Sequence, residues 1–164
     1  MNRYLFLDFH GVLQPVGSPV DRLFCQLELL ESWLRLHPSV LVGISSSWRM
    51  PHPLDGLREF FSEDLRYRVV GATGLDWRDV HQRTREMPFE VRHEGELEVV
   101  AWLRANAADG DIWMALEDDV GLFRPGDARV VGCDPGTGLT AKHFNCWSHW
   151  FVTSTGPRRW MGYE

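Results

Sequence analysis

Three short apolar runs, each of strand length, constrain the fold of this chain more than any other feature of its sequence. They cover residues 4–9 (YLFLDF), 40–44 (VLVGI) and 112–116 (IWMAL), and polar or acidic residues follow each of them. Runs this apolar are typical of strands that are buried on both faces of a parallel sheet. Residues 129–133 and the shorter stretch 68–70 complete the set of expected strands.

Helical periodicity fills the intervals between these runs. Helices are expected over residues 20–36, 54–61 and 95–107, and a further helix is expected to begin after Thr140 as its N-cap. In the first of these, the leucines follow the three- and four-residue spacing of one helical face. Residues 71–88 are polar and Gly-rich, so an irregular segment is expected there.

Strands that alternate with helices predict an α/β fold with a doubly wound, mainly parallel sheet. Ligands of such sheets bind beyond the carboxyl ends of the strands, so Asp8, Ser46 and Asp118 are expected to converge at one edge. A chain of 164 residues suffices for one domain with its own core. We expect one domain over residues 1–152 and a C-terminal extension of it over residues 153–164.

Composition and charge narrow the class of protein. The net charge of -6 and the pI of about 5.6 argue against a strong overall attraction to nucleic acid or anionic lipid. They do not exclude a local basic pocket. Three widely spaced cysteines without a C-x-x-C pair argue against a disulfide framework and favour a reducing compartment. The apolar segment near the N-terminus is too short for a signal peptide or a membrane span. We therefore expect a cytoplasmic protein with no membrane partner.

Asp8 is the first candidate for chemistry, because it stands at the end of a buried strand. The strand would hold this carboxylate in place, and the turn at Gly11 would leave the approach to it open. A carboxylate so placed can attack phosphorus, and Gly11 lets a phosphate or a metal come close to the backbone. The alternative is that Asp8 only caps a turn.

A serine-rich loop follows the second apolar run. Ser45, Ser46 and Ser47 can donate hydroxyl and backbone hydrogen bonds to a phosphate, and serines are also common helix caps. Arg49 adds a planar cation that matches phosphate oxygens, and a surface arginine is the alternative. The loop is therefore a candidate substrate-binding element.

The third long run leads into the acids Glu117, Asp118 and Asp119. Adjacent like charges are costly unless a cation neutralises them, and hard oxygen ligands suit Mg²⁺. The alternative is that an acid caps the following helix near Val120. We expect one of the acids to cap this helix and another to face a metal.

These segments together resemble a known family. LFLDFHGVL, ISSSWR and ALEDD, in this order, resemble motifs one, two and four of the haloacid dehalogenase superfamily. With RVVGATG and DPGTGLT, they are similar to the short phosphatase-type domain of Swiss Army Knife RNA repair proteins, over residues 4 to about 152. The resemblance implies a Rossmann-like core with little or no cap domain, and Mg²⁺ as the cofactor.

The same resemblance implies roles for the candidate residues. Asp8 would be the phosphorylated nucleophile and a metal ligand, and Ser46, or alternatively Ser45, would be the phosphate-binding hydroxyl. Asp118, with Glu117 or Asp119, would supply the acids on the metal side. The basic residue of motif three would be Arg92, with Arg83 and Arg85 as competitors.

His10 departs from the family pattern. The family usually carries Asp two residues after the nucleophile, where it protonates the leaving group and later activates water, and here the residue is His10. The change puts turnover in doubt. The metal contact expected from residue 10 is its backbone carbonyl, which does not depend on the side chain.

The leading interpretation is a Mg²⁺-dependent phosphomonoester hydrolase that acts on a phosphorylated small molecule or a nucleic-acid end through an aspartyl-phosphate on Asp8. One alternative is a non-catalytic module that binds a phosphate or a nucleic-acid end. Another is a structural partner subunit with an exposed patch formed by Trp147, Trp150 and Trp160. The sequence predicts no oligomeric state.

The C-terminal helix carries His143, Cys146 and His149 at a spacing of three residues, which zinc could use. Aromatic residues are interleaved with them, and we prefer an aromatic packing helix to a zinc site.

Overall fold

The computed structural model describes residues 1–74, 93–145 and 147 of the chain. Five parallel strands form one sheet with the order β3-β2-β1-β4-β5. The strands are β1 (Arg3–Leu7), β2 (Val40–Ile44), β3 (Val69–Ala72), β4 (Ile112–Glu117) and β5 (Val130–Gly132). The helices are α1 (Leu27–Leu36), α2 (Leu54–Glu59) and α4 (Glu94–Asn106), with single turns η1 (Val20–Arg22), η2 (Ser47–Arg49) and η5 (Val120–Leu122) and the longer η3 (Glu63–Arg68). The expected α/β fold with a parallel sheet is confirmed.

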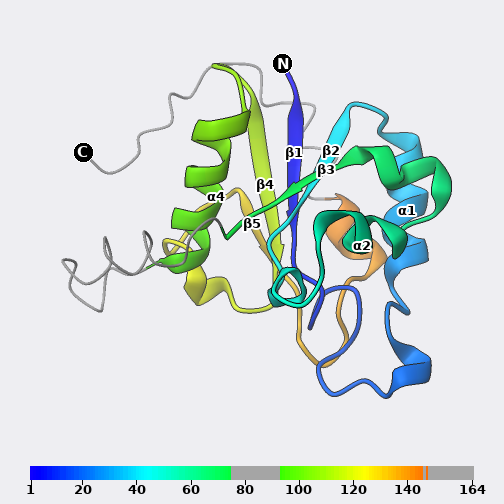
Figure 1. Cartoon of the computed structure of the whole chain (residues 1–164). Helices are drawn as coiled ribbons and strands as arrows, with labels where there is room; N and C mark the ends of the chain where they lie inside the picture. Colours follow the sequence, from blue (N-terminus) through cyan, green and yellow to red (C-terminus); the bar gives the residue numbers. More distant parts are fainter. Residues whose placement is uncertain (75–92, 146, 148–164) are drawn as a thin grey trace.

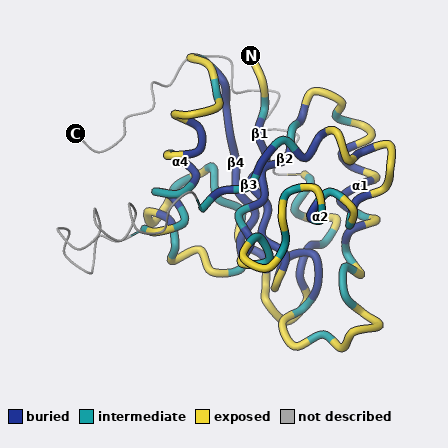
Figure 2. The backbone as a smooth tube through the Cα atoms, viewed as in Figure 1, coloured by how far each residue is buried: buried dark blue, intermediate teal, exposed yellow. Residues whose placement is uncertain are grey.

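Helices cover both faces of the sheet, so the molecule has three layers (Figure 1). Leu5 and Leu7 of β1 pack on the side of α1 and α2, and Tyr4 and Phe6 pack on the side of α4. Figure 2 shows that β1 and β4 are almost wholly buried at the centre of the molecule. This two-faced burial explains why the strands are apolar without alternation.

The predicted helix over residues 20–36 is wrong in its first half, because α1 begins only at Leu27. Phe24 has φ +57, which an α-helix cannot contain. The side chain of Gln14 accepts a hydrogen bond from the Phe24 backbone N–H (2.9 Å), and the carbonyl of Leu13 accepts one from Gln26 N–H (2.9 Å). These contacts with the loop after β1 override the leucine periodicity.

The remaining element boundaries differ by few residues from the predicted ones. Residues 141–145 and 147 are helical, as expected after Thr140. Between β1 and α1 the chain adds a loop with η1 and no separate cap domain. Within the described residues, no helix is both long and apolar enough to span a membrane.

The C-terminal helix packs through its aromatic residues. Trp147 is fully buried, with its ring 5.1 Å from that of Trp33 and 4.9 Å from that of Phe144. An exposed patch that includes Trp147 is therefore excluded. Trp150, Trp160, Cys146 and His149 lie outside the described residues. The expected extension over residues 153–164 also lies outside them.

Candidate active site

The site lies at the carboxyl ends of the central strands, where backbone hydrogen bonds continue the sheet by one residue. The N–H of Asp8 donates to the carbonyl of Leu116 (3.1 Å), and that of Ser45 donates to Leu7 (2.9 Å). On the other side, the Cys133 N–H donates to Glu117 (2.9 Å). The register of the sheet therefore fixes the backbone of the first residue after β1, β2 and β5.

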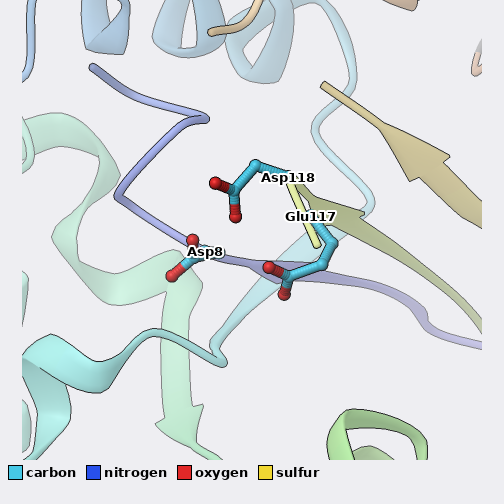
Figure 3. Close-up of side chains that lie close together, drawn as sticks. All are labelled: Asp8, Glu117 and Asp118. Carbon is cyan, nitrogen blue, oxygen red and sulfur yellow. The ribbon is translucent and has the colours of Figure 1, made fainter. Parts of the chain in front are cut away.

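Three carboxylates meet at this edge, as Figure 3 shows. Asp8, Glu117 and Asp118 each offer one oxygen, and these three oxygens lie within 4.8 Å of one another. Asp8 and Glu117 are buried, and Asp118 is half-buried. Asp119 does not belong to this cluster: it is exposed, and its side chain accepts a hydrogen bond from the Gly121 N–H (3.1 Å) at the start of η5.

Burial and mutual repulsion resist ionisation of this acid cluster. Desolvation and the charge of Asp8 raise the pKa of Glu117 from its ordinary value of 4.5 to about 8. Desolvation also raises the pKa of Asp8, with a smaller contribution from Asp118, against hydrogen bonds from Ser46 and the backbone of Phe9 that lower it. A divalent cation beside the acids would lower their pKa values and favour the ionised carboxylates. Three oxygen donors suit a hard cation such as Mg²⁺. The residues present therefore fit the cofactor that the sequence predicts.

The turn after Asp8 leaves no room for a side chain at position 11. The carbonyl of Phe9 accepts hydrogen bonds from the N–H groups of Val12 (3.3 Å) and Leu13 (2.9 Å), so the chain reverses at once. Gly11 has φ +66, and a Cβ built on it would overlap the carboxylate of Asp118. Glycine is required here both by its backbone conformation and by the close approach of this acid.

The serine loop offers one hydroxyl to the acids. Ser46 is fully buried, and its side chain accepts a hydrogen bond from the Trp48 N–H (3.4 Å). Its hydroxyl also lies beside the carboxylate of Asp8 and lowers the pKa of that acid. The hydroxyl of Ser45 is buried and makes no hydrogen bond to any described residue, although Ser45 as a whole is half-buried. Ser47 is exposed at the start of η2. Of the three serines, Ser46 therefore stands in contact with the expected nucleophile.

Arg49 makes other contacts than those expected of a phosphate-binding arginine. Its guanidinium donates to both carboxylate oxygens of Glu98 on α4 (2.9 and 2.8 Å) and to the carbonyls of Ser45 and Ser46 (2.9 Å each). Glu98 also accepts from the hydroxyl of Thr73 after β3 (3.2 Å). Arg49 thus ties the serine loop to α4, and a role in binding phosphate stays a prediction.

His10 is exposed, and its ring lies 5.8 Å from that of Trp48 rather than in the acid cluster. Its positive charge would lower the pKa of Asp8. The metal contact expected from its backbone carbonyl stays a prediction. Arg92, Arg83 and Arg85 lie outside the described residues.

Cys133 is a site neighbour that the sequence did not indicate. Burial raises the pKa of its thiol to about 12, and the charges of Asp118, Glu117 and Asp8 add to the effect. The thiol therefore stays neutral beside the acids. Glu98 and Thr73 were also missed, because no local pattern connects a helix residue to an arginine 49 positions earlier.

A parallel five-stranded α/β sheet with an acid cluster at its carboxyl edge is the architecture of a haloacid dehalogenase (HAD) core. A family model described as the HAD domain in Swiss Army Knife RNA repair proteins matches residues 4–144, and the chain belongs to this family. Neither the search of curated proteins nor that of solved structures gave a match. Family membership supports a function of the HAD fold that is related to phosphoryl transfer.

Proposed function

We propose that this protein hydrolyses phosphomonoesters, with Asp8 as the nucleophile. The observation that carries the proposal is the placement of the buried Asp8 carboxylate, with one oxygen within 4.8 Å of an oxygen of Glu117 and of Asp118, and with the Ser46 hydroxyl beside it. A carboxylate held by a strand end needs no reorganisation before it attacks. Bound among these three acids, Mg²⁺ would neutralise the negative charge that nucleophile and phosphate bring together.

The reaction has two steps in this proposal. In the first, an Asp8 oxygen forms a bond to phosphorus while the bond from phosphorus to the ester oxygen breaks, and the leaving oxygen takes a proton from the His10 imidazolium. In the second, water attacks the phosphorus of the aspartyl-phosphate and gives a proton to His10, which restores Asp8 and releases phosphate. Imidazole can serve both as acid and as base near neutral pH. The exposed position of His10 leaves its ring open to a substrate.

The expected substrate is a phosphorylated small molecule or a nucleic-acid end. The family description names RNA repair proteins, which favours the second. The net charge of -6 does not attract long nucleic acid as a whole, so a short end or a mononucleotide fits better than an extended duplex.

The test is turnover of a panel of nucleotides, sugar phosphates and phosphorylated RNA ends with Mg²⁺, by the wild type and by Asp8→Asn. We expect Asp8→Asn to abolish hydrolysis and to keep the circular dichroism spectrum, because the amide is nearly isosteric with the carboxylate but a poor nucleophile. Acid-quenched wild type should carry a phosphoryl group on the peptide that contains Asp8. Undiminished turnover by Asp8→Asn would refute the mechanism.

A non-catalytic phosphate-binding module is the second candidate, and the contact of His10 with Trp48 favours it. If the imidazole stays against this ring, the oxygen of the leaving group has no proton donor. His10→Asp restores the acid usual in the family, and a gain of turnover in this variant over an inactive wild type would assign the binding role to the natural chain. Turnover by the wild type that is lost in His10→Asn would instead support the catalytic role.

A further inference from the structure

A shallow hollow is lined by residues that lie close in sequence to the residues of the acid cluster and the serine loop. His10, Ser47, Trp48, Pro51 and His52 line it, and its volume is about 290 Å³. We propose that this hollow is a subsite for the planar base of a nucleotide or a nucleic-acid end whose phosphate lies at Asp8. The inference rests on the proposed function and deepens it, because it names the substrate class of the same site.

The lining offers the surface that a base needs. Trp48 and His52 lie with their rings nearly parallel, at 16° and 5.7 Å between centroids, and none of the five lining residues is a lysine or an arginine. A planar ring can stack on these aromatic faces, whereas a second phosphate would find no lysine or arginine among the lining residues. The volume lies near the lower end of the roughly 300–1,000 Å³ typical of small-molecule sites, which fits one base rather than a long segment.

The aromatic surface is held in place from behind. The ring of Trp48 lies 5.1 Å from that of Phe24, 5.4 Å from that of Phe60 and 6.0 Å from that of Phe9. Phe9 is fully buried in the core, so this cluster connects Trp48 to the rigid sheet. A ring fixed in this way loses little conformational freedom when a base stacks on it.

The position of the hollow links it to the phosphate. His10 follows Asp8 by two residues, and Ser47 directly follows Ser46, the serine whose hydroxyl lies beside Asp8. One ligand can therefore contact both regions. Arg49, the nearest arginine along the chain, holds Glu98 and the loop carbonyls, so recognition by stacking explains the site better than recognition by charge.

The experiment measures binding, so that it does not depend on turnover. The full-length Asp8→Asn variant with Mg²⁺ is titrated by calorimetry with AMP, UMP and ribose 5-phosphate. Stacking of a base on an aromatic side chain should make the two nucleotides bind about 5- to 150-fold more tightly than the sugar phosphate. Trp48→Ala, introduced in the same background, should remove this preference, and Trp48→Phe should keep part of it.

His52→Ala provides a second route, because His52 is only half-buried, so its loss should reduce the preference without unfolding the chain. Tyr67→Ala is the matched control: Tyr67 is an aromatic residue with 73% exposure outside the hollow, and its loss should leave all affinities within 2-fold. A phosphorylated trinucleotide separates the sources of the base: tighter binding than that of AMP assigns the subsite to a nucleic-acid end, and equal binding assigns it to a mononucleotide.

Two failures are distinguishable. If ribose 5-phosphate binds but the nucleotides bind no better, or if Trp48→Ala weakens all three ligands equally, the base subsite is refuted and the proposed phosphatase site stands. If none of the phosphates binds to the wild type or to Asp8→Asn, the proposed function itself fails.

Discussion

At the scale of single residues, the three serines after β2 separate into one that contacts the expected nucleophile and two that do not. Ser46→Ala removes the hydroxyl that lies beside Asp8, and Ser47→Ala removes the hydroxyl of an exposed residue. Hydrogen bonds to charged groups contribute about 1.5–3 kcal/mol, so Ser46→Ala should weaken binding of orthovanadate, a phosphate analogue, roughly 10- to 150-fold. Ser47→Ala should change it less than 2-fold. Equal losses in the two variants would contradict the assignment.

Gly11 is the second residue at which we expect a small substitution, the addition of one methyl group, to disturb the site. Gly11→Ala adds a methyl group that overlaps Asp118 at a backbone position with φ +66. We expect loss of Mg²⁺ affinity, because the acid must move away from Asp8, together with about 1 kcal/mol or more of lost stability. Gly17→Ala is the control: Gly17 also has a positive φ, of +77, and no atom lies within 4 Å of the place that its added methyl group would take. If both variants lose Mg²⁺ affinity equally, the close approach to Asp118 is not the cause.

The sequence predicted which acids share an edge, because residues that end neighbouring parallel strands must meet there. It did not predict which acid caps η5. Asp118 and Asp119 are adjacent and chemically identical, and only the direction of each side chain, toward the cluster or toward the Gly121 N–H, separates them. Direction of this kind depends on the turn at Gly121, which no pattern in the sequence reports.

At the scale of elements, an ion pair joins the serine loop to α4. The side chains of Arg49 and Glu98 are 16% and 18% exposed, so the pair is largely shielded from solvent. Glu98→Gln should cost about 1.5–3 kcal/mol in the free energy of unfolding, and it should weaken phosphate binding because Arg49 no longer fixes the loop carbonyls. Glu94→Gln makes the same charge change at an exposed position of α4 and should cost less than about 0.5 kcal/mol.

Chemical denaturation and vanadate titration of the two variants check this prediction. A loss of stability in Glu98→Gln without a loss of vanadate affinity would show that the ion pair supports the fold but does not position the loop.

Elements with purely local determinants were predicted well, and those shaped by distant contacts were not. The strand Val40–Ile44 matches its predicted range, because a strand that is buried on both faces has no polar residues, and this run of five is recognised from its composition alone. The start of α1 was missed, because Phe24 takes its conformation from a contact with Gln14, ten residues earlier, and packs on Phe9. Leucine spacing alone cannot report such a contact.

At the scale of the whole molecule, the sheet concentrates negative charge at one edge, and this links stability to pH. In the metal-free protein, the Glu117 carboxyl has a pKa of about 8, against an ordinary value of 4.5 in the unfolded chain. Below 4.5 it is protonated in both states. Between 4.5 and about 8 the unfolded state ionises and the folded state does not, so the contribution of Glu117 to stability falls as pH rises, and it levels off above about 8.

Mg²⁺ competes with protons for these carboxylates and stabilises only the folded state, so its effect should grow over the same range. We expect the difference in melting temperature between samples with Mg²⁺ and with EDTA to be small near pH 5 and large near pH 8, in buffers of equal ionic strength. Taking this difference cancels the pH dependence of groups remote from the site. Glu117→Gln cannot ionise, so its EDTA sample should lose less stability between the two pH values than the wild type, and Mg²⁺ should stabilise it less at pH 8. A wild-type difference that stays constant with pH, or one that Glu117→Gln leaves unchanged, would show that Glu117 does not face the cation.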